Sequence, residues 1–516
     1  MMYLFEMFEL EFQGKILHDS WAQADLEAVF VHESVCVKTK GFYAGNGIYK
    51  VRFLPELEGI WRWKVSGVFE SGGQELCVKS DNIKNHGVVR TKGTHFVYSD
   101  GTWFYPFGTT VYALPNQEKE TIQMTLTSLS QSPFNKVRMC VFPKHYKYND
   151  NEPEYYAFEK EDGHWNVKKP CLKFWDHLEQ VIQQLHVLGI EVDLILLHPY
   201  DRWGFSTMQK NEYMIYLDYL IRRLAAFPNI WWSLANEYDL MDGIACDWWS
   251  DFADFIGKND PYHHLLSNHN IFEYWDFDNK DTTHCCIQDT RLWMVGQLLK
   301  KHNKPVVVDE CCYEGNLPAE WGNLSGEEMV HRFWAVTAAG GYCTHGETYL
   351  NSDECIWWSK GGRLVGTSPE RIAFLREILE SLPGPLSCYV SPDCLSEEKV
   401  MEMKTEKECL ARFIQNYPEK RAFITHIIRQ PWDVITAKIN RGRFFESHYL
   451  DKCYLRYIGK QCSCETTMYL PEQKKYTVEV IDTWEMTRTI VLRGVSGKTI
   501  IPLPGKEKLA VLARSE

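Results

Sequence analysis

Apolar runs of strand length alternate with stretches of helical period through the middle of the chain. The runs are continuous rather than alternating, which is typical of strands covered on both faces. Between them, residues 174–189 and 212–228 carry apolar positions three and four apart and end near glycine or proline, which predicts helices. The runs comprise residues 104–110, 136–142, 191–197, 230–236, 264–270, 283–289, 304–310 and 340–346.

Eight such units predict a (β/α)8 barrel, an α/β fold, because eight strand–helix units in roughly 275 residues match the usual barrel size. The runs at 264–270 and 283–289 are the shortest and most polar, so they are the weakest members of the pattern. Charged and polar residues at the ends of the runs are then of most interest, since barrel enzymes place their catalytic groups at the carboxyl ends of the strands.

The segments flanking the barrel have a different pattern, with short alternating strands and glycine turns. Before the barrel, a turn at Gly45-Asn46-Gly47 separates two such strands, and Asp100-Gly101 between aromatic runs predicts a hairpin. Residues 384–430 look like a connector with possible strand pieces. We therefore expect an N-terminal β-sandwich, a barrel and a C-terminal β-sandwich, over residues 1–85, 86–385 and 386–516.

Composition narrows the choice of partner. The net charge of −13 disfavours nucleic acid and anionic membranes, which would repel the protein on average. Aromatic residues make up 14% of the chain, which suits stacking on sugar rings as well as ordinary core packing. Neither a signal peptide nor a membrane-spanning stretch is evident, so the cytoplasm is the expected location.

The chain has 17 cysteines but no CxxC spacing, which argues against a zinc site. We expect these cysteines to be mostly reduced, buried and inert, as in a reducing compartment. The sequence indicates neither a cofactor nor a metal ion.

Two glutamates occupy the ends of facing strands of the predicted barrel. Glu237 follows the fourth apolar run in the sequence Asn236-Glu237, and Glu310 ends the seventh. Glycoside cleavage needs such a pair, one carboxylic acid to protonate the leaving oxygen and one carboxylate to attack or to activate water. Their separation decides between retention and inversion of configuration.

Other strand ends carry groups that can hydrogen bond sugar hydroxyls or stack on sugar rings. At the sixth strand, His284 and Gln288 are alternatives for the residue that faces Glu310. A third carboxylate, Glu347, follows the eighth strand and could bind a hydroxyl, modulate a catalytic pKa or pair with His345. The candidate sugar-binding residues are Tyr112, His145, His198, Asp201, Trp203, His269, His345, Glu347 and Trp357, with Thr110, Lys144, Tyr200, Arg202, Asn268, Asn270 and Trp358 as further strand-end residues.

The Asn236-Glu237 pair together with Glu310 resembles the clan of retaining (β/α)8 glycosidases that includes β-galactosidases, cellulases and β-xylosidases. The resemblance implies that Glu237 is the acid/base, Glu310 the nucleophile, Asn236 a ligand of the sugar 2-hydroxyl and Arg138 a support for the nucleophile. Many clan members end strand eight with tryptophan, whereas this chain has Thr344-His345-Gly346-Glu347.

The phrases GFYAGNGIYKVRF, FYPFGTT and LANEYD are similar to those of a narrower group, the bacterial apiosidase-like glycosidases with a sandwich on either side of the barrel. That likeness covers nearly the whole chain but fixes no substrate. It implies a retaining glycosidase, and a cytoplasmic location favours exo action on short oligosaccharides or glycosides.

Two alternatives stay open. One is a metal-dependent barrel hydrolase, since several histidines and an aspartate lie near strand ends. However, HxH and HExxH pairs are absent. The other is a non-catalytic carbohydrate-binding protein, which the presence of both carboxylates disfavours. The two sandwiches could also pack on the barrel or mediate a homo-oligomer. The residues that the metal hypothesis would use are His145, His198, Asp201, His269, His284 and His345.

Overall fold

The computed structural model describes residues 1–33, 35–82, 84–352, 355–392, 394–441 and 445–516. These residues divide into two compact units. The first comprises Met1–Thr290, Leu298–Phe333 and Tyr342–Glu380, and the second comprises Arg291–Gln297, Trp334–Gly341 and Ser381–Glu516.

Eight parallel strands form a nearly closed barrel in the first unit, and each of the eight expected runs contains one of them. The barrel prediction is therefore confirmed. Around the ring the order is β18-β17-β16-β13-β12-β22-β20-β19. The strands are β12 (Phe107–Thr110), β13 (Lys136–Cys140), β16 (Glu191–Leu197), β17 (Ile230–Ala235), β18 (Leu266–Ser267), β19 (Cys285–Gln288), β20 (Val306–Glu310) and β22 (Tyr342–His345).

The seam of the barrel lies between β18 and β19, the two strands whose sequence pattern was weakest. β18 is only two residues long. The Ser267 hydroxyl crosses the seam, donating to the His284 carbonyl (2.7 Å) and accepting from the Cys286 N–H (3.3 Å). These bonds join the seam together with one backbone hydrogen bond, from the Thr283 N–H to the Leu266 carbonyl at 2.8 Å.

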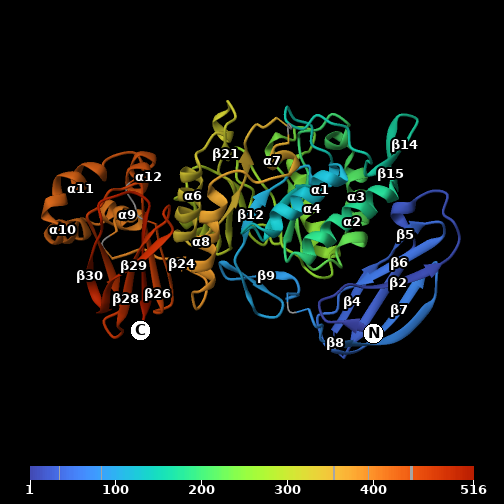
Figure 1. Ribbon diagram of the computed structural model, residues 1–516, viewed down its shortest axis with the longest axis horizontal. Coiled ribbons are helices and arrows are strands. Elements are labelled where there is room, and N and C mark those ends of the chain that lie inside the picture. The colour runs from blue at the N-terminus through green and yellow to red at the C-terminus, as the bar shows by residue number, and fades with distance from the viewer. Residues whose placement is uncertain (34, 83, 353–354, 393, 442–444) are drawn as a thin grey trace. The chain divides into compact units, whose positions relative to one another are not determined.

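Helices follow the strands and cover the barrel (Figure 1). In α2 (Leu172–Val187), Trp175, Leu178, Ile182 and Leu185 recur every three or four residues and are fully buried, so this stripe packs inward. Both helices expected from periodicity are present. The second expected helix is α3 (Lys210–Leu224). The remaining helices of this region are α1 (Lys119–Ser130), α4 (Cys246–Asn259), α5 (Met294–His302), α6 (Gly326–Ala338), α7 (Trp357–Lys360) and α8 (Ser368–Glu380).

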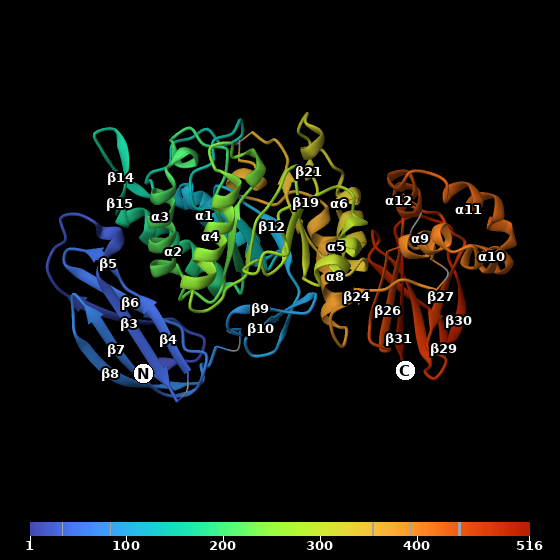
Figure 2. The same ribbon diagram turned by 180° about the vertical axis from the view of Figure 1, so that it is seen from behind.

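The N-terminal region forms the expected pair of sheets (Figure 2). Phe30 and Phe53 stack across the two sheets with ring centroids 4.1 Å apart. Residues 45–47 all have positive φ, which explains the Gly-Asn-Gly sequence of this turn. The strands are β1 (Met2–Tyr3), β2 (Phe8–Gln13), β3 (Leu26–His32), β4 (Val35–Lys40), β5 (Phe42–Gly45), β6 (Ile48–Phe53), β7 (Gly59–Gly67) and β8 (Ser71–Val78).

A small sheet then leads into the barrel. It consists of β9 (Val89–Lys92), β10 (His95–Tyr98) and β11 (Trp103–Phe104), and the expected hairpin at Asp100-Gly101 joins the last two. Phe96 packs with Trp231 and Tyr342, which lie at the first residues of their barrel strands. The sheet thus covers the end of the barrel opposite the strand carboxyl termini.

The second unit contains a six-stranded sheet, β24-β25-β26-β31-β28-β29, and the strand pair β27-β30. The five strands expected in residues 455–505 are present. The strands are β24 (Ser387–Cys388), β25 (Phe445–Tyr449), β26 (Cys453–Gly459), β27 (Glu465–Leu470), β28 (Tyr476–Asp482), β29 (Thr487–Val495), β30 (Gly497–Pro502) and β31 (Leu509–Ser515).

The expectation of a connector over residues 384–430 is wrong for most of that stretch, because it forms helices that lie at one end of the sheet in both views (Figures 1 and 2). Val400, Met403, Ile424 and Ile435 bury together in a small core. The apolar positions of these helices are few and are separated by many charged residues, so the sequence shows no clear helical period. The helices of this stretch are α9 (Glu397–Thr405), α10 (Lys407–Asn416) and α11 (Arg421–Ile427), and α12 (Trp432–Arg441) follows it.

All 17 cysteines lie in described segments as thiols outside any disulfide. Four of them, Cys36, Cys246, Cys462 and Cys464, are exposed, so the expectation of burial holds for only part of the set. Among the described residues, no helix combines the length and apolar character needed to cross a bilayer.

Candidate active site

The two predicted catalytic carboxylates lie at the carboxyl ends of β17 and β20. Glu237 stands two residues beyond β17 and has a left-handed backbone, with φ of 54°. That conformation is uncommon for a residue with a side chain and is often found at functional sites. Glu310 is the last residue of β20. Both are almost buried, with exposures of 5% and 8%.

Glu237 has the environment of a carboxylic acid. Its pKa is raised to about 7, first by burial and then by the negative charge of Glu310. The Tyr200 hydroxyl donates to its Oε2, and the Gln288 side chain also hydrogen bonds to it, which opposes part of that rise. Since the charge of Glu310 raises the pKa of Glu237, the two carboxylates share one site.

Glu310 is held by tyrosine hydroxyls. The Tyr112 hydroxyl donates to its Oε1 and lies 3.0 Å from Asn236 Oδ1 and 3.4 Å from the Tyr313 hydroxyl. Tyr313 also hydrogen bonds to Glu310. Donated hydrogen bonds stabilise a carboxylate that must act as an anion.

His269 completes the immediate surroundings of Glu310. Its Nδ1 accepts from the Glu237 backbone N–H at 3.4 Å, and its Nε2 lies 3.8 Å from Glu310 Oε1. Burial holds the pKa of His269 well below its usual value, so the ring is neutral. Because Nδ1 accepts, the assigned tautomer carries its proton on Nε2, facing the carboxylate.

Aromatic rings and one lysine line the space above the carboxylates. The Lys144 ammonium lies over the rings of Tyr112, Tyr200 and Trp358, at 3.6, 4.3 and 5.0 Å from their centroids. Trp321 packs against Trp358 with centroids 5.1 Å apart. The site is therefore an aromatic cage with a cation inside it.

The structure brings together five of the predicted site residues, namely Glu237, Glu310, Asn236, Tyr112 and His269. Arg138 lies deeper, fully buried, with Nε 3.3 Å from Asp193 and 4.0 Å from Asp309. It belongs to a buried group of charges with Lys136, which lies 2.6 Å from Asp309. That group supports the end of β20, which carries Glu310.

The remaining predicted residues have other partners or lie further out. Asp201 accepts the backbone N–H groups of Trp203 and Ser206 at 2.7 Å and so shapes its own loop. His345 lies 3.1 Å from the Thr109 hydroxyl, to which the Trp357 indole also donates.

Glu347 accepts the Val365 and Gly366 N–H groups, although burial raises its pKa to about 7. His198 donates to the Phe142 carbonyl (3.2 Å), and His145 packs edge-on against the part-buried Trp203. Sugar contact by these residues stays a prediction.

Of the two strand-six alternatives, Gln288 hydrogen bonds to Glu237, whereas His284 packs against Phe96 and Trp231 at the opposite end of the barrel. The tyrosine contacts of Glu310 come from the ends of β12 and β20. Tyr313 was missed because it follows β20 within a loop, where a single sequence gives no signal of direction.

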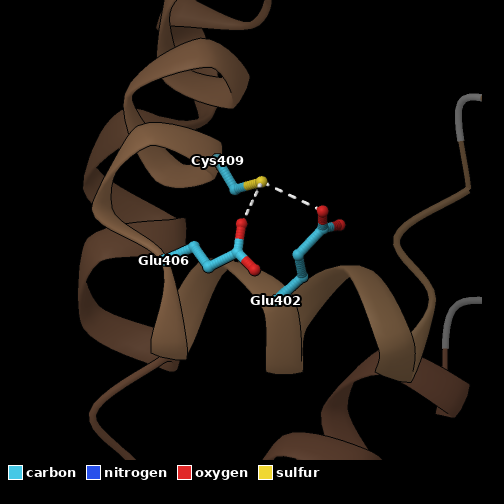
Figure 3. Close-up of side chains that lie close together, drawn as sticks. All are labelled: Glu402, Glu406 and Cys409. Carbon is cyan, nitrogen blue, oxygen red and sulfur yellow. Dashed lines mark hydrogen bonds between the residues drawn. The ribbon is translucent and has the colours of Figure 1, made fainter.

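The metal hypothesis finds no support in the described segments. There the strand-end histidines do not gather within ligand distance of one another, and the group that does gather is Glu402, Glu406 and Cys409 in α9 and α10 (Figure 3). The Cys409 thiol donates to the two carboxylates at 3.0 and 3.4 Å. These hydrogen bonds and carboxylates raise the pKa of the thiol to about 11, so the cluster is satisfied as a surface hydrogen-bond group.

Comparisons with known proteins identify the family of the chain. The family model described as "Apiosidase-like, catalytic domain" matches residues 90–368, more than half of the chain. Two domains of unknown function, DUF5060 and DUF5605, match residues 2–67 and 432–514. No curated protein matches the sequence.

Solved structures extend the likeness over the full length. A candidate glycoside hydrolase from Bacteroides vulgatus is 32% identical, with a TM-score of 0.84 over 100% of this chain and 99% of that one. A family 5 glycoside hydrolase from the same organism shares the fold, at 14% identity and a TM-score of 0.59 over 84% of this chain and 93% of that one. The chain therefore belongs to the apiosidase-like family of glycosidases, with its (β/α)8 barrel as the catalytic domain.

Proposed function

We propose that this protein is a retaining, exo-acting glycosidase that removes a terminal sugar from short oligosaccharides or glycosides. The observation that carries the proposal is the contrast between its two carboxylates. Glu237 has a pKa near 7 and can hold a proton, whereas Glu310 accepts hydrogen bonds from tyrosine hydroxyls. A carboxyl group with a raised pKa beside a second carboxylate that accepts hydrogen bonds is the arrangement expected of a general acid and a nucleophile.

The reaction has two steps. Glu310 attacks the anomeric carbon while Glu237 gives its proton to the leaving oxygen, which forms a glycosyl ester on Glu310. The ionised Glu237 then takes a proton from water, whose oxygen attacks the anomeric carbon and releases Glu310. Two inversions give net retention, and Glu237 ends protonated as it began.

The aromatic residues support exo action. Tyr146, Trp321 and Trp358 follow three different barrel strands and contact one another, with centroids 5.1 to 6.2 Å apart. These rings pack with Tyr112 in one hydrophobic cluster. A wall of aromatic rings on one side of the carboxylates would favour a chain end over the middle of a polymer.

Hydrolysis of a panel of aryl glycosides, with pyranosides and furanosides together, tests the proposal. We expect at least one to turn over, and proton NMR to show first the product anomer that matches the substrate. First appearance of the opposite anomer would contradict retention. Release of internal fragments rather than a monosaccharide from an oligosaccharide would contradict exo action.

A further inference from the structure

Lys144 differs from the other buried cations of the first unit. Lys136, Arg52 and Arg223 each lie within 2.9 Å of a carboxylate, and Arg138 lies 3.3 Å from the carboxylate of Asp193. Lys144 is only 4% exposed, yet among the described residues no carboxylate lies within 4.0 Å of its ammonium, and no hydrogen bond of its side chain occurs there. Its three N–H donors are therefore left for a partner outside the protein.

Burying an ammonium group costs free energy unless another group compensates its charge and accepts its hydrogen bonds. A buried ammonium is destabilising when unpaired, and cation–π contacts offset part of that cost without satisfying its donors. Burial lowers the pKa of Lys144, while the negative charges of Glu237 and Glu310 oppose that change. A protein retains an uncompensated group of this kind where a ligand supplies the missing contact.

The position of Lys144 indicates which ligand group this is. Its ammonium lies over both Tyr112, which hydrogen bonds to Glu310, and Tyr200, which hydrogen bonds to Glu237. The sugar that is transferred must lie between those two carboxylates. Lys144 therefore faces that sugar rather than a distant part of the substrate.

An anionic oxygen pair fits this position better than hydroxyls. A neutral hydroxyl accepts hydrogen bonds but carries no negative charge, whereas a carboxylate supplies both charge and acceptors. Without a cation, a sugar carboxylate would be repelled by Glu310. We propose that Lys144 is a specificity-determining residue that binds the carboxylate of a uronic acid, so that the transferred sugar is a hexuronic acid. This inference rests on the proposed glycosidase function.

Matched substrate pairs test the inference. The pairs are 4-nitrophenyl glucuronide against glucoside and galacturonide against galactoside, in both anomers. We expect the wild type to prefer one uronide by about 100-fold in kcat/KM, in the range seen when a buried charge pair is broken. We expect Lys144→Met to lose that preference and Lys144→Arg to keep part of it. Lys147→Met, at an exposed lysine of the same loop, is the matched control and should behave as wild type.

A binding measurement separates this inference from the proposed function. Calorimetry would compare D-glucuronate with D-glucose and D-galacturonate with D-galactose, on the wild type and on Lys144→Met. Tighter binding of a uronate that Lys144→Met removes supports the inference even if no glycoside turns over, in which case only the glycosidase proposal fails.

Equal binding of uronates and neutral sugars by the wild type would overturn the inference, as would hydrolysis of neutral glycosides as fast as of uronides. These wild-type results decide the question even if Lys144→Met does not fold.

Discussion

At the residue scale, the two carboxylates of the site differ in their neighbours more than in their burial. Glu237 and Glu310 are exposed by 5% and 8%, but the first faces Tyr200 and Gln288 and the second faces Tyr112 and Tyr313. Burial and the negative charge of Glu310 raise the pKa of Glu237, so it can hold a proton while Glu310 accepts the tyrosine hydrogen bonds.

Removing either carboxylate should remove most turnover. We expect Glu310→Ala and Glu237→Gln each to lower kcat by roughly 100- to 10,000-fold, the range for a lost nucleophile or general acid. Glu377→Gln, an exposed position of α8, is the control and should keep wild-type rates. Steady-state kinetics on the best aryl glycoside measures this, and near-wild-type rates in either active-site variant would refute the assignment.

The pH dependence should follow the proton on Glu237. As general acid it must be protonated, so kcat/KM should fall as pH rises through about 7. The Tyr200 hydrogen bond lowers this pKa, so Tyr200→Phe should move the alkaline limb to higher pH. A pH–rate profile of both proteins checks the direction, and a shift toward lower pH would count against Tyr200 as the partner of the acid.

Part of this site could be predicted from the sequence. Apolar runs lead directly to Glu237, Glu310 and Tyr112. The strand therefore places these side chains at its carboxyl end, where the site lies. Tyr200 and Asp201 are adjacent, yet one reaches the acid while the other holds its own loop, and only the loop conformation separates them. Tyr313 depends on loop geometry in the same way.

At the element scale, continuous apolar runs predicted all eight barrel strands, because strands buried on both faces need no polar positions. β18 shows the limit of this rule, because it has only two residues and the Ser267 side chain helps to join it to β19. The helices α9 to α12 escaped prediction because their buried positions, such as Val400 and Met403, are outnumbered by charges.

Glu191, the first residue of β16, makes this strand sensitive to pH. Burial raises its pKa to about 8, above its ordinary 4.5, so its protonated form fits the fold and stability falls as pH rises from near 4.5 to 8. Glu191→Gln keeps an acceptor for the Trp231 indole N–H, 3.0 Å away, without the charge.

We expect Glu191→Gln to match the wild type near pH 5 and to be more stable at pH 8. The gain should be a few kcal/mol at most, since one pKa unit corresponds to about 1.4 kcal/mol. Denaturant unfolding at the two pH values measures it. A variant that is less stable at pH 8 would show that the carboxylate itself is needed.

At the scale of the whole molecule, a buried ion group joins the N-terminal sheets to the barrel within the first unit. Arg52 of β6 makes a bidentate pair with Glu179 of α2, with both N–O distances 2.8 Å. Arg223 of α3 binds the same carboxylate at 2.5 Å. One carboxylate thus holds two guanidinium groups from separate elements.

Removing one member of this ion group should lower the stability of the fold without changing the catalytic rate. Glu179→Ala leaves two buried cations with less compensation, and removing one partner of such a pair typically costs about 3–5 kcal/mol. We expect a clear loss of stability in denaturant unfolding with kcat nearly unchanged. Arg62→Ala, at an exposed arginine of β7, is the control. A large fall in kcat with stability preserved would contradict this structural role.

The most direct test of the central claim is to trap the covalent intermediate. A 2-deoxy-2-fluoro analogue of the aryl glycoside that turns over would be incubated with the wild type, digested and analysed by mass spectrometry. The account predicts one sugar attached to the peptide that contains Glu310, with inactivation in step with labelling. Attachment to Glu237, or turnover of the parent glycoside with inversion and no adduct, would contradict it.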